Sequence, residues 1–215
     1  MKFAKLAALA VAMAYGTSQA AVITFQTGFS DAGVQSSATA YRDVVNAAVA
    51  NSTQSTVLSN YDIVSNQSLF GAGASNIAFK SSIDFGLANS GTYSFRAGVD
   101  FGNGGAVFLD GQAVDLKTND MWWAHSYDNT NSVFTVNNQA LSAGNHTLTI
   151  YGLEGCCDGG QQVQFSANGG AFQSFSANTL QLTAAVPEPE TYAMMLGGLG
   201  LVGVAARRRR SKQVA

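Results

Sequence analysis

Two adjacent cysteines are the most reactive side chains in this chain of 215 residues. Cys156 and Cys157 are its only cysteines, and they lie within the segment Gly-Cys-Cys-Asp-Gly-Gly. Under oxidising conditions three states are open: a disulfide between the two neighbours, disulfides to a second molecule, or two buried thiols. A disulfide between neighbours closes no long loop, so we expect a rigid apolar kink that could serve as a ligand platform or, being strained, as a redox centre.

Aromatic residues gather in a polar segment, 117–131, that we expect to be a loop. Trp122, Trp123 and Tyr127 lie close together there, and Asp128 follows directly. Neighbouring side chains of an extended chain point to opposite sides, so one tryptophan is expected inside and the other outside. An exposed ring would stack on a sugar, with a carboxylate as hydrogen-bond partner. The alternative is that both rings cap the core.

Metal and catalytic chemistry have weaker support in the sequence. Asp100 and Asp110 lie at predicted turns and are the candidate calcium ligands, although turn aspartates commonly serve the turn alone. Adjacent cysteines rarely direct both thiolates to one tetrahedral ion, which disfavours a zinc site. There is no nucleophile elbow and no phosphate loop, and Glu154 is the only glutamate between residues 21 and 185. We therefore predict no catalytic activity, with a glycan hydrolase as the less favoured alternative.

Short strands must position these residues. Apolar residues alternate with small polar ones in many short runs, and glycine or asparagine turns separate the runs, which is typical of a β-sandwich of jelly-roll type. Asp110-Gly111 and the segment 168–170 predict two hairpin turns. One helix is expected over 40–50, capped by Thr39 and Asn51. The predicted strands include 21–25, 77–79, 83–85, 93–99, 107–109, 112–114, 133–136, 163–165 and 172–175. In the segment 141–151, a tight turn at Ala143-Gly144 leads into a further alternating strand.

The charge distribution excludes one class of partner. Between residues 21 and 185 there are eleven acidic and four basic residues, an excess of seven negative charges, whereas the whole chain carries −2. Such a body repels phosphate groups, so we expect no binding to nucleic acid. Seven of the eleven lysines and arginines lie in the two terminal segments.

The first twenty residues have the pattern of a secretory signal peptide. Lys2 and Lys5 precede an apolar run that is too short to span a membrane, and Ser18-Gln19-Ala20 offers small residues at the positions that a signal peptidase reads. We expect cleavage after Ala20. The chain would therefore be exported, and the folded domain would begin at residue 21.

The last thirty residues, 186–215, combine three features in order. Pro187-Glu188-Pro189 is followed by an apolar segment at 192–206, a predicted transmembrane helix, and then by four arginines, Arg207, Arg208, Arg209 and Arg210. This tail resembles a PEP-CTERM sorting signal. The resemblance implies a Gram-negative protein that crosses the inner membrane, is held transiently by its tail, and is cut by an exosortase near the motif. The alternative is an ordinary C-terminal anchor.

A second resemblance concerns the body, residues 21–185. The segments 93–100, 106–114 and 141–150, the last reading Leu-Ser-Ala-Gly-Asn-His-Thr-Leu-Thr-Ile, are similar to a PA14-type β-sandwich. Lectins of that family hold calcium through two adjacent aspartates, whereas here Phe101 follows Asp100. The Cys-Cys-x-Gly string beside the tail also resembles the CCXG group of PEP-CTERM proteins.

These observations predict an exported protein of the cell surface or of an exopolysaccharide and biofilm matrix. Its expected partners are signal peptidase, an exosortase and, before processing, the membrane. A carbohydrate-binding module for the matrix polysaccharide is the alternative function. No cofactor is expected other than the candidate calcium ion.

Overall fold

The structure is a computed structural model that describes residues 19–182 and Gly198. The predicted signal peptide, apart from its last two residues, lies outside this range. So do the Pro-Glu-Pro motif, the four arginines and, except for Gly198, the predicted transmembrane segment. Within the described part of the chain, no helix is both long and apolar enough to cross a membrane.

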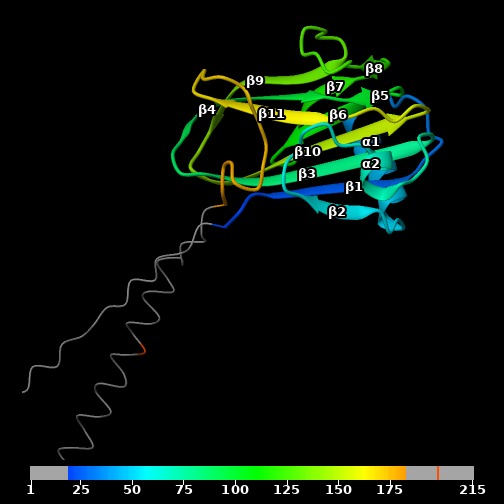
Figure 1. Cartoon of the computed structure of the whole chain (residues 1–215). Coiled ribbons are helices and arrows are strands. Elements are labelled where there is room, and N and C mark those ends of the chain that lie inside the picture. Colours follow the sequence, from blue (N-terminus) through cyan, green and yellow to red (C-terminus); the bar gives the residue numbers. More distant parts are fainter. Residues whose placement is uncertain (1–18, 183–197, 199–215) are drawn as a thin grey trace, which may run out of the picture. The chain divides into compact units, whose positions relative to one another are not determined.

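Two antiparallel sheets lie face to face (Figure 1). The larger sheet has the strand order β2-β1-β3-β10-β6-β7, and the smaller has the order β12-β11-β4-β9. A short pair, β5 with β8, lies at one end. The strands are β1 (Val22–Phe29), β2 (Ser55–Leu58), β3 (Ile77–Leu87), β4 (Gly91–Gly98), β5 (Asp100–Phe101), β6 (Gly105–Leu109), β7 (Gln112–Lys117), β8 (Met121–Trp122), β9 (Val133–Leu141), β10 (Gly144–Glu154), β11 (Gln162–Ala167) and β12 (Gln173–Ser174).

The space between the sheets is filled by alternate residues of the strands, many of them phenylalanines. Phe85 of the larger sheet lies 5.6 Å from Phe95 of the smaller one, measured between ring centroids, and Phe175 contacts both rings. Such offset and tilted ring pairs add to the stabilisation that comes from apolar burial. The predicted all-β sandwich is confirmed, and the alternation of single phenylalanines with small polar residues is its sequence signature.

Helix α1 (Ala38–Ala50) forms the predicted helix and packs on the face of the larger sheet that lies away from the other sheet. Tyr41 and Val45 are buried there, against Phe108 among others. Asn51 ends the helix as predicted, but Ser37 and not Thr39 caps its start, because the Ser37 hydroxyl accepts the backbone N–H of Ala40. The prediction missed a second, one-turn helix, α2 (Asn66–Phe70), which has a capping box but too few residues for a periodic pattern.

The hairpin turns are where the sequence predicted them. Asp110 and Gly111, with φ of 50° and 78°, connect β6 to β7, and β11 pairs with β12 across residues 168–170. Two other predictions were wrong. The runs 77–79 and 83–85 belong to one continuous strand, β3, and the expected loop 117–131 contains strand β8. In both places a partner strand supplies the backbone hydrogen bonds, which the local sequence does not reveal.

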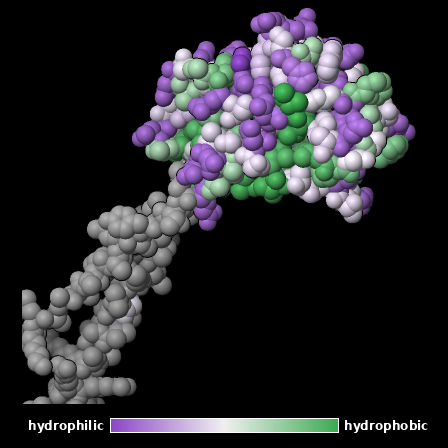
Figure 2. Space-filling view, viewed as in Figure 1, coloured by the Kyte–Doolittle hydropathy of each residue, from purple (hydrophilic) through white to green (hydrophobic). Residues whose placement is uncertain are grey.

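The two ends of the described domain lie together, at the opposite end from β5 and β8 (Figure 1). Gln19 bridges to Leu182, and the backbone N–H of Gly86 donates to Leu180. Strand β10 runs from this end to Glu154. On the face seen in Figure 2, residues of hydrophilic or intermediate character cover most of the sandwich, and strongly hydrophobic residues gather in a patch toward its lower edge.

Candidate functional site

An open pocket of about 660 Å³ lies at the end of the sandwich that carries β5 and β8. Asp100 of β5 is the register partner of Trp122 of β8, so this short strand pair forms one wall. The loop that follows β10 forms another wall. The pocket is lined by Asp100, Gly102, Asn103, Asp120, Trp122, Glu154, Gly155, Cys156 and Cys157.

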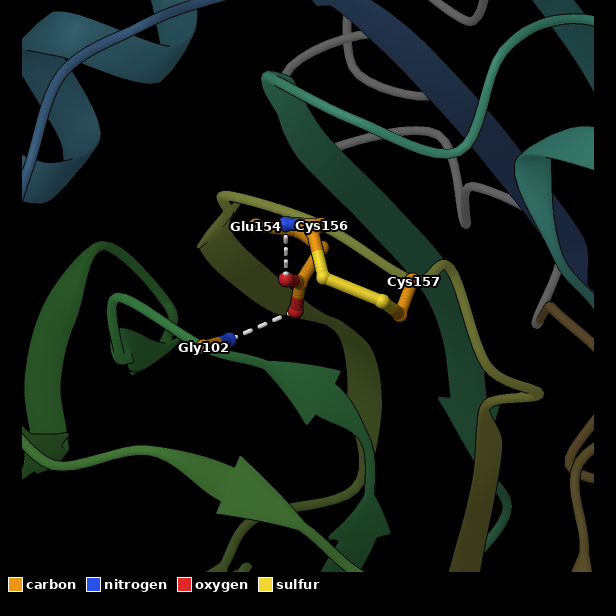
Figure 3. The surroundings of a disulfide bond; sticks show 4 residues. All are labelled: Gly102, Glu154, Cys156 and Cys157. Carbon is orange, nitrogen blue, oxygen red and sulfur yellow. Dashed lines mark hydrogen bonds between the residues drawn. A yellow bond between two sulfur atoms is a disulfide. The ribbon is translucent and has the colours of Figure 1, made fainter.

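Glu154, at the end of β10, holds the two walls together (Figure 3). Glu154 is 3% exposed, and its carboxylate accepts the backbone N–H of Gly102 at 2.6 Å and that of Cys156 at 2.7 Å. Burial raises the pKa of Glu154, and these N–H groups oppose the rise by stabilising the charged form. Glu154 therefore fixes the loop after β5 relative to the cysteine loop, and sequence reasoning missed this role.

The cysteine pair forms a disulfide between neighbours, the first of the three states that the sequence left open. Cys156 and Cys157 are both exposed and line the pocket (Figure 3). Cys157 has φ of 75°, a left-handed conformation that sharply turns the chain. The disulfide thus presents a small, rigid and apolar surface to the interior of the pocket.

Asp100 is the most perturbed carboxyl group of the pocket. Its pKa is raised to about 7, first by burial, then by the charge of Glu154, with smaller contributions from Asp120 and Asp158. A hydrogen bond from the backbone N–H of Gly159 opposes the rise. Asp100 is 8% exposed, and no basic side chain pairs with it in the described part of the chain. Its charged form therefore lacks a cationic partner inside the fold.

The two adjacent tryptophans have different surroundings. Trp123 is 2% exposed, and its indole N–H donates to the carbonyl of Gly160 at 2.5 Å. Its ring lies directly on Gly98, where a Cβ atom would come within 2.1 Å of the ring. Trp122 is 48% exposed and lines the pocket. Trp123 therefore belongs to the packed interior, and Trp122 is available to a ligand.

Tyr127 and Asp128, the other two candidate ligand residues, do not line this pocket. The Tyr127 hydroxyl donates to the carbonyl of Gln162, and its ring lies 3.8 Å from the guanidinium carbon of Arg96. Burial is the main cause that raises the pKa of Tyr127. Asp128 is exposed, and its backbone N–H donates to Ser126. The structure therefore gives Tyr127 an internal packing role.

The two candidate calcium ligands lie far apart. Asp110 accepts from the backbone N–H of Thr147 at 2.9 Å and pairs with His146 at 2.7 Å, so both of its carboxylate oxygens are already in use. In the described residues, no three acidic, histidine or cysteine side chains are arranged to hold a metal ion. Calcium prefers six or more oxygen ligands, and these residues fit that requirement poorly. Calcium at Asp100 stays a prediction.

The tail matches a known family. Residues 185–210 match the family described as the PEP-CTERM protein-sorting motif, which covers the Pro187-Glu188-Pro189 motif, the apolar segment and all four arginines. The chain thus carries a PEP-CTERM sorting signal, which implies export, a transient membrane anchor and processing by an exosortase. A comparison with curated proteins found no match.

The body resembles solved PA14 domains. The PA14 sugar-binding domain from an RTX adhesin is 16% identical, with a TM-score of 0.51, and the match covers 79% of this chain and 100% of that domain. The PA14 domain of the MpAFP antifreeze protein is 15% identical, with a TM-score of 0.46 and coverage of 82% and 100%. The A domain of epithelial adhesin 9 from Candida glabrata, in complex with Galβ1-3GlcNAc, is 8% identical, with a TM-score of 0.49 and coverage of 81% and 99%.

At such identities the likeness to the adhesin domain shows the fold alone. The body of this chain is a PA14-like β-sandwich, as the sequence predicted. A PEP-CTERM tail on a PA14-like body is the combination that defines this chain.

Proposed function

We propose that this protein is a non-catalytic component of the cell surface or extracellular matrix that binds carbohydrate in the pocket beside the disulfide. The observation that carries the proposal is that Trp122, the exposed tryptophan, lines the same open pocket as Asp100 and Asp120. A sugar ring has apolar C–H faces and a hydroxyl edge. The pocket offers a surface of matching chemistry to each.

The apolar surfaces are the Trp122 ring and the disulfide of Cys156 and Cys157. An exposed aromatic ring in a concave site suits stacking against the face of a pyranose. Carboxylate oxygens of Asp100 and Asp120 would accept hydrogen bonds from sugar hydroxyls, and the side-chain amide of Asn103 can donate or accept. The volume of about 660 Å³ lies within the usual range for small-ligand sites.

The position of the pocket suits a protein attached through its C-terminal segment. The described domain ends at Leu182, which lies at the start of β10, whereas the pocket lies where β10 ends at Glu154. The chain continues from Leu182 into the sorting motif. The last described residue of the domain and the pocket therefore lie at opposite ends of the domain.

A glycan hydrolase is the second candidate function, and the pocket leaves one pair of carboxyl groups for it. A glycosidase needs two carboxyl groups that are free to act on the glycosidic bond. Both oxygens of Glu154 are held by backbone N–H groups, which leaves Asp100 and Asp120 as the remaining pair. The likeness to sugar-binding adhesin domains adds no catalytic feature, and we propose binding without turnover.

Retention on immobilised polysaccharides tests the binding site. We expect the full chain to bind at least one glycan of a broad panel and Trp122→Ala to weaken that binding by about fivefold, since stacking on an aromatic ring contributes on the order of 1 kcal/mol. Phe29→Ala is the matched control, because Phe29 is a more exposed ring outside the pocket. Equal binding by both variants would overturn the proposed site, and release of reducing ends would support the hydrolase.

The proposed destination has its own test, the intact mass of the protein recovered from its native cells and medium. We propose that signal peptidase cleaves after Ala20 at the inner membrane of a Gram-negative bacterium, and that exosortase cleaves near Pro189. A mass that lacks both segments and two hydrogen atoms supports this processing and the disulfide. A mass that retains Arg207 to Arg210 would indicate an ordinary anchored protein instead.

A further inference from the structure

The charged residues that line the pocket are all acidic. They are Asp100, Asp120 and Glu154, and among residues 19–182 no lysine, arginine or histidine lines the pocket with them. Asp158 adds a fourth negative charge close enough to raise the pKa of Asp100. A ligand in this pocket therefore meets a concentrated negative potential, which a concave site with apolar walls strengthens.

The surroundings of Asp100 indicate which kind of ligand group would be attracted by this negative potential. It is more than nine-tenths buried, yet it lines the pocket and has no cationic partner in the described part of the chain. Buried carboxylates are normally paired with a positive charge. Glu154 cannot take the role of ligand group, because backbone N–H groups occupy both of its oxygens. Asp100 responds to its surroundings with a raised pKa, and a cation bound beside it would stabilise its charged form.

We propose that the saccharide bound here carries a positively charged amino group, as in a glucosamine polymer without N-acetyl groups. This inference rests on the proposed carbohydrate-binding function and specifies its ligand. The ammonium group binds between Asp100 and Asp120, and the pyranose ring lies against Trp122 and the disulfide. Ammonium is a three-donor group, so it can satisfy both carboxylates while the ring remains stacked.

Other sugar classes fit these residues less well. A uronic acid would bring a further negative charge beside three carboxylates, and like charges in a partly desolvated site repel each other. An N-acetylated sugar would stack equally well on Trp122 but leaves Asp100 without a cation. A bridging calcium ion would need more free oxygen ligands than Asp100 and Asp120 supply.

Titration of the full chain with two oligosaccharides of equal length, one of glucosamine and one of N-acetylglucosamine, tests the proposal. At low salt and pH 7 we expect the glucosamine oligomer to bind about fivefold tighter than the N-acetylglucosamine oligomer, because a partly exposed ion pair contributes little. Added salt should reduce this preference, because it screens the ion pair. Asp120→Asn should remove most of the preference. Asp43→Asn is the matched control, because it removes an exposed carboxylate from helix α1, outside the pocket.

Acidification supplies a second readout. Between pH 7 and pH 5 Asp100, with a pKa of about 7, takes up a proton and loses its attraction, while the amino group of the oligomer also becomes more fully protonated. A comparison with Asp100→Asn at each pH removes the second effect, because it is common to both proteins. We therefore expect this variant to bind the glucosamine oligomer more weakly than the natural protein at pH 7 and about equally at pH 5. Glu154, Asp120 and Asp158 face Asp100 and contribute to its titration.

The outcomes separate this inference from the function on which it rests. Three results would overturn the amino-sugar inference while carbohydrate binding stands. They are equal affinity for both oligomers, a preference for the acetylated oligomer or for uronic acids, and binding that requires calcium and shows no preference for amino sugars. If no glycan of either kind binds, the proposed function itself fails. A salt-sensitive preference for the glucosamine oligomer that is lost in Asp120→Asn supports both carbohydrate binding and the amino-sugar inference.

Discussion

Two aspartates at opposite ends of strand β10 show how the same side chain serves different purposes in this protein. Asp110, beside Thr147, pairs with His146 and receives a backbone N–H. Asp100 lies near Glu154, seven residues further along β10, which is roughly 23 Å at the usual rise of a strand. Asp110 has its charge balanced within the fold, whereas Asp100 lies among other carboxylates.

The difference is also visible in the acid–base properties of the two ends. Burial lowers the pKa of His146, but the hydrogen bond with Asp110, the carbonyl of Ser142 and the charge of Asp110 outweigh it, so the pKa is raised. Both ring nitrogens of His146 face acceptors, which favours the doubly protonated ring. A charge that the fold balances stabilises a turn, and a charge that the fold leaves unbalanced is available to a ligand.

The largest effect is expected at the pocket end, from Glu154→Ala. This change leaves two backbone N–H groups, those of Gly102 and Cys156, without their acceptor in a partly buried place. We expect the free energy of unfolding to fall by about 3 kcal/mol, as is typical for unsatisfied buried donors. Denaturant titration measures the loss, and Glu154→Gln, which keeps one acceptor oxygen, should lose less. An unchanged midpoint in the alanine variant would mean that Glu154 does not connect the two walls.

The substitution Asp100→Asn is expected to raise the free energy of unfolding, by less than Glu154→Ala lowers it. The folded state raises the pKa of Asp100 from 3.8 to about 7, so the folded protein holds a proton that the unfolded chain releases between these values. Stability from this group is complete below pH 4 and is lost as pH rises toward 7. The asparagine variant should be more stable than the natural protein by about 2 kcal/mol at pH 8 and show little difference at pH 4. A thermal unfolding series against pH decides between this result and an unshifted carboxyl group.

The smallest effect is expected at the opposite end, from Asp110→Asn. The raised pKa of His146 means that its stabilising contribution is complete below about pH 6.5 and is lost as pH rises through the higher, folded value. We expect the variant to lose about 1 kcal/mol at pH 5.5 and less at a pH high enough to make histidine neutral in both proteins. An equal loss at both values would show that the Asp110 bond to the Thr147 backbone matters and the ion pair does not. Because Asp110 is distant from the pocket, glycan binding should not change.

Local chemistry explains the parts of the fold that the sequence predicted well. Asp110-Gly111 is a turn dipeptide with positive φ at both residues, so its hairpin needs no distant partner. The same holds for helix α1, whose buried face has helical spacing and whose C-cap is Asn51. Strand β3 was divided in two because Lys80 to Ser82 is polar in sequence, although β1 and β10 pair with it on both sides.

The pocket could be predicted in its residue types but not in its assembly. Trp122, Asp100 and the cysteine pair were each singled out from the sequence, whereas Tyr127, Asp128 and Asp110 proved to lie elsewhere. Glu154 was missed as a connecting residue. Its position as the sole glutamate of the body, two residues before the cysteines, was the one available signal.

By itself, the sequence determined the sorting signal, the alternation that makes strands, and the presence of an aromatic, acidic and disulfide-forming set of residues. These properties depend on neighbours along the chain. Tertiary structure alone decided which tryptophan is buried and which aspartate lacks a cation. The pocket walls come from segments near residues 100, 120 and 154, and long-range strand pairing brings them to one end of the sandwich. Burial and charge balance are set by that assembly, because both depend on atoms that are distant in sequence.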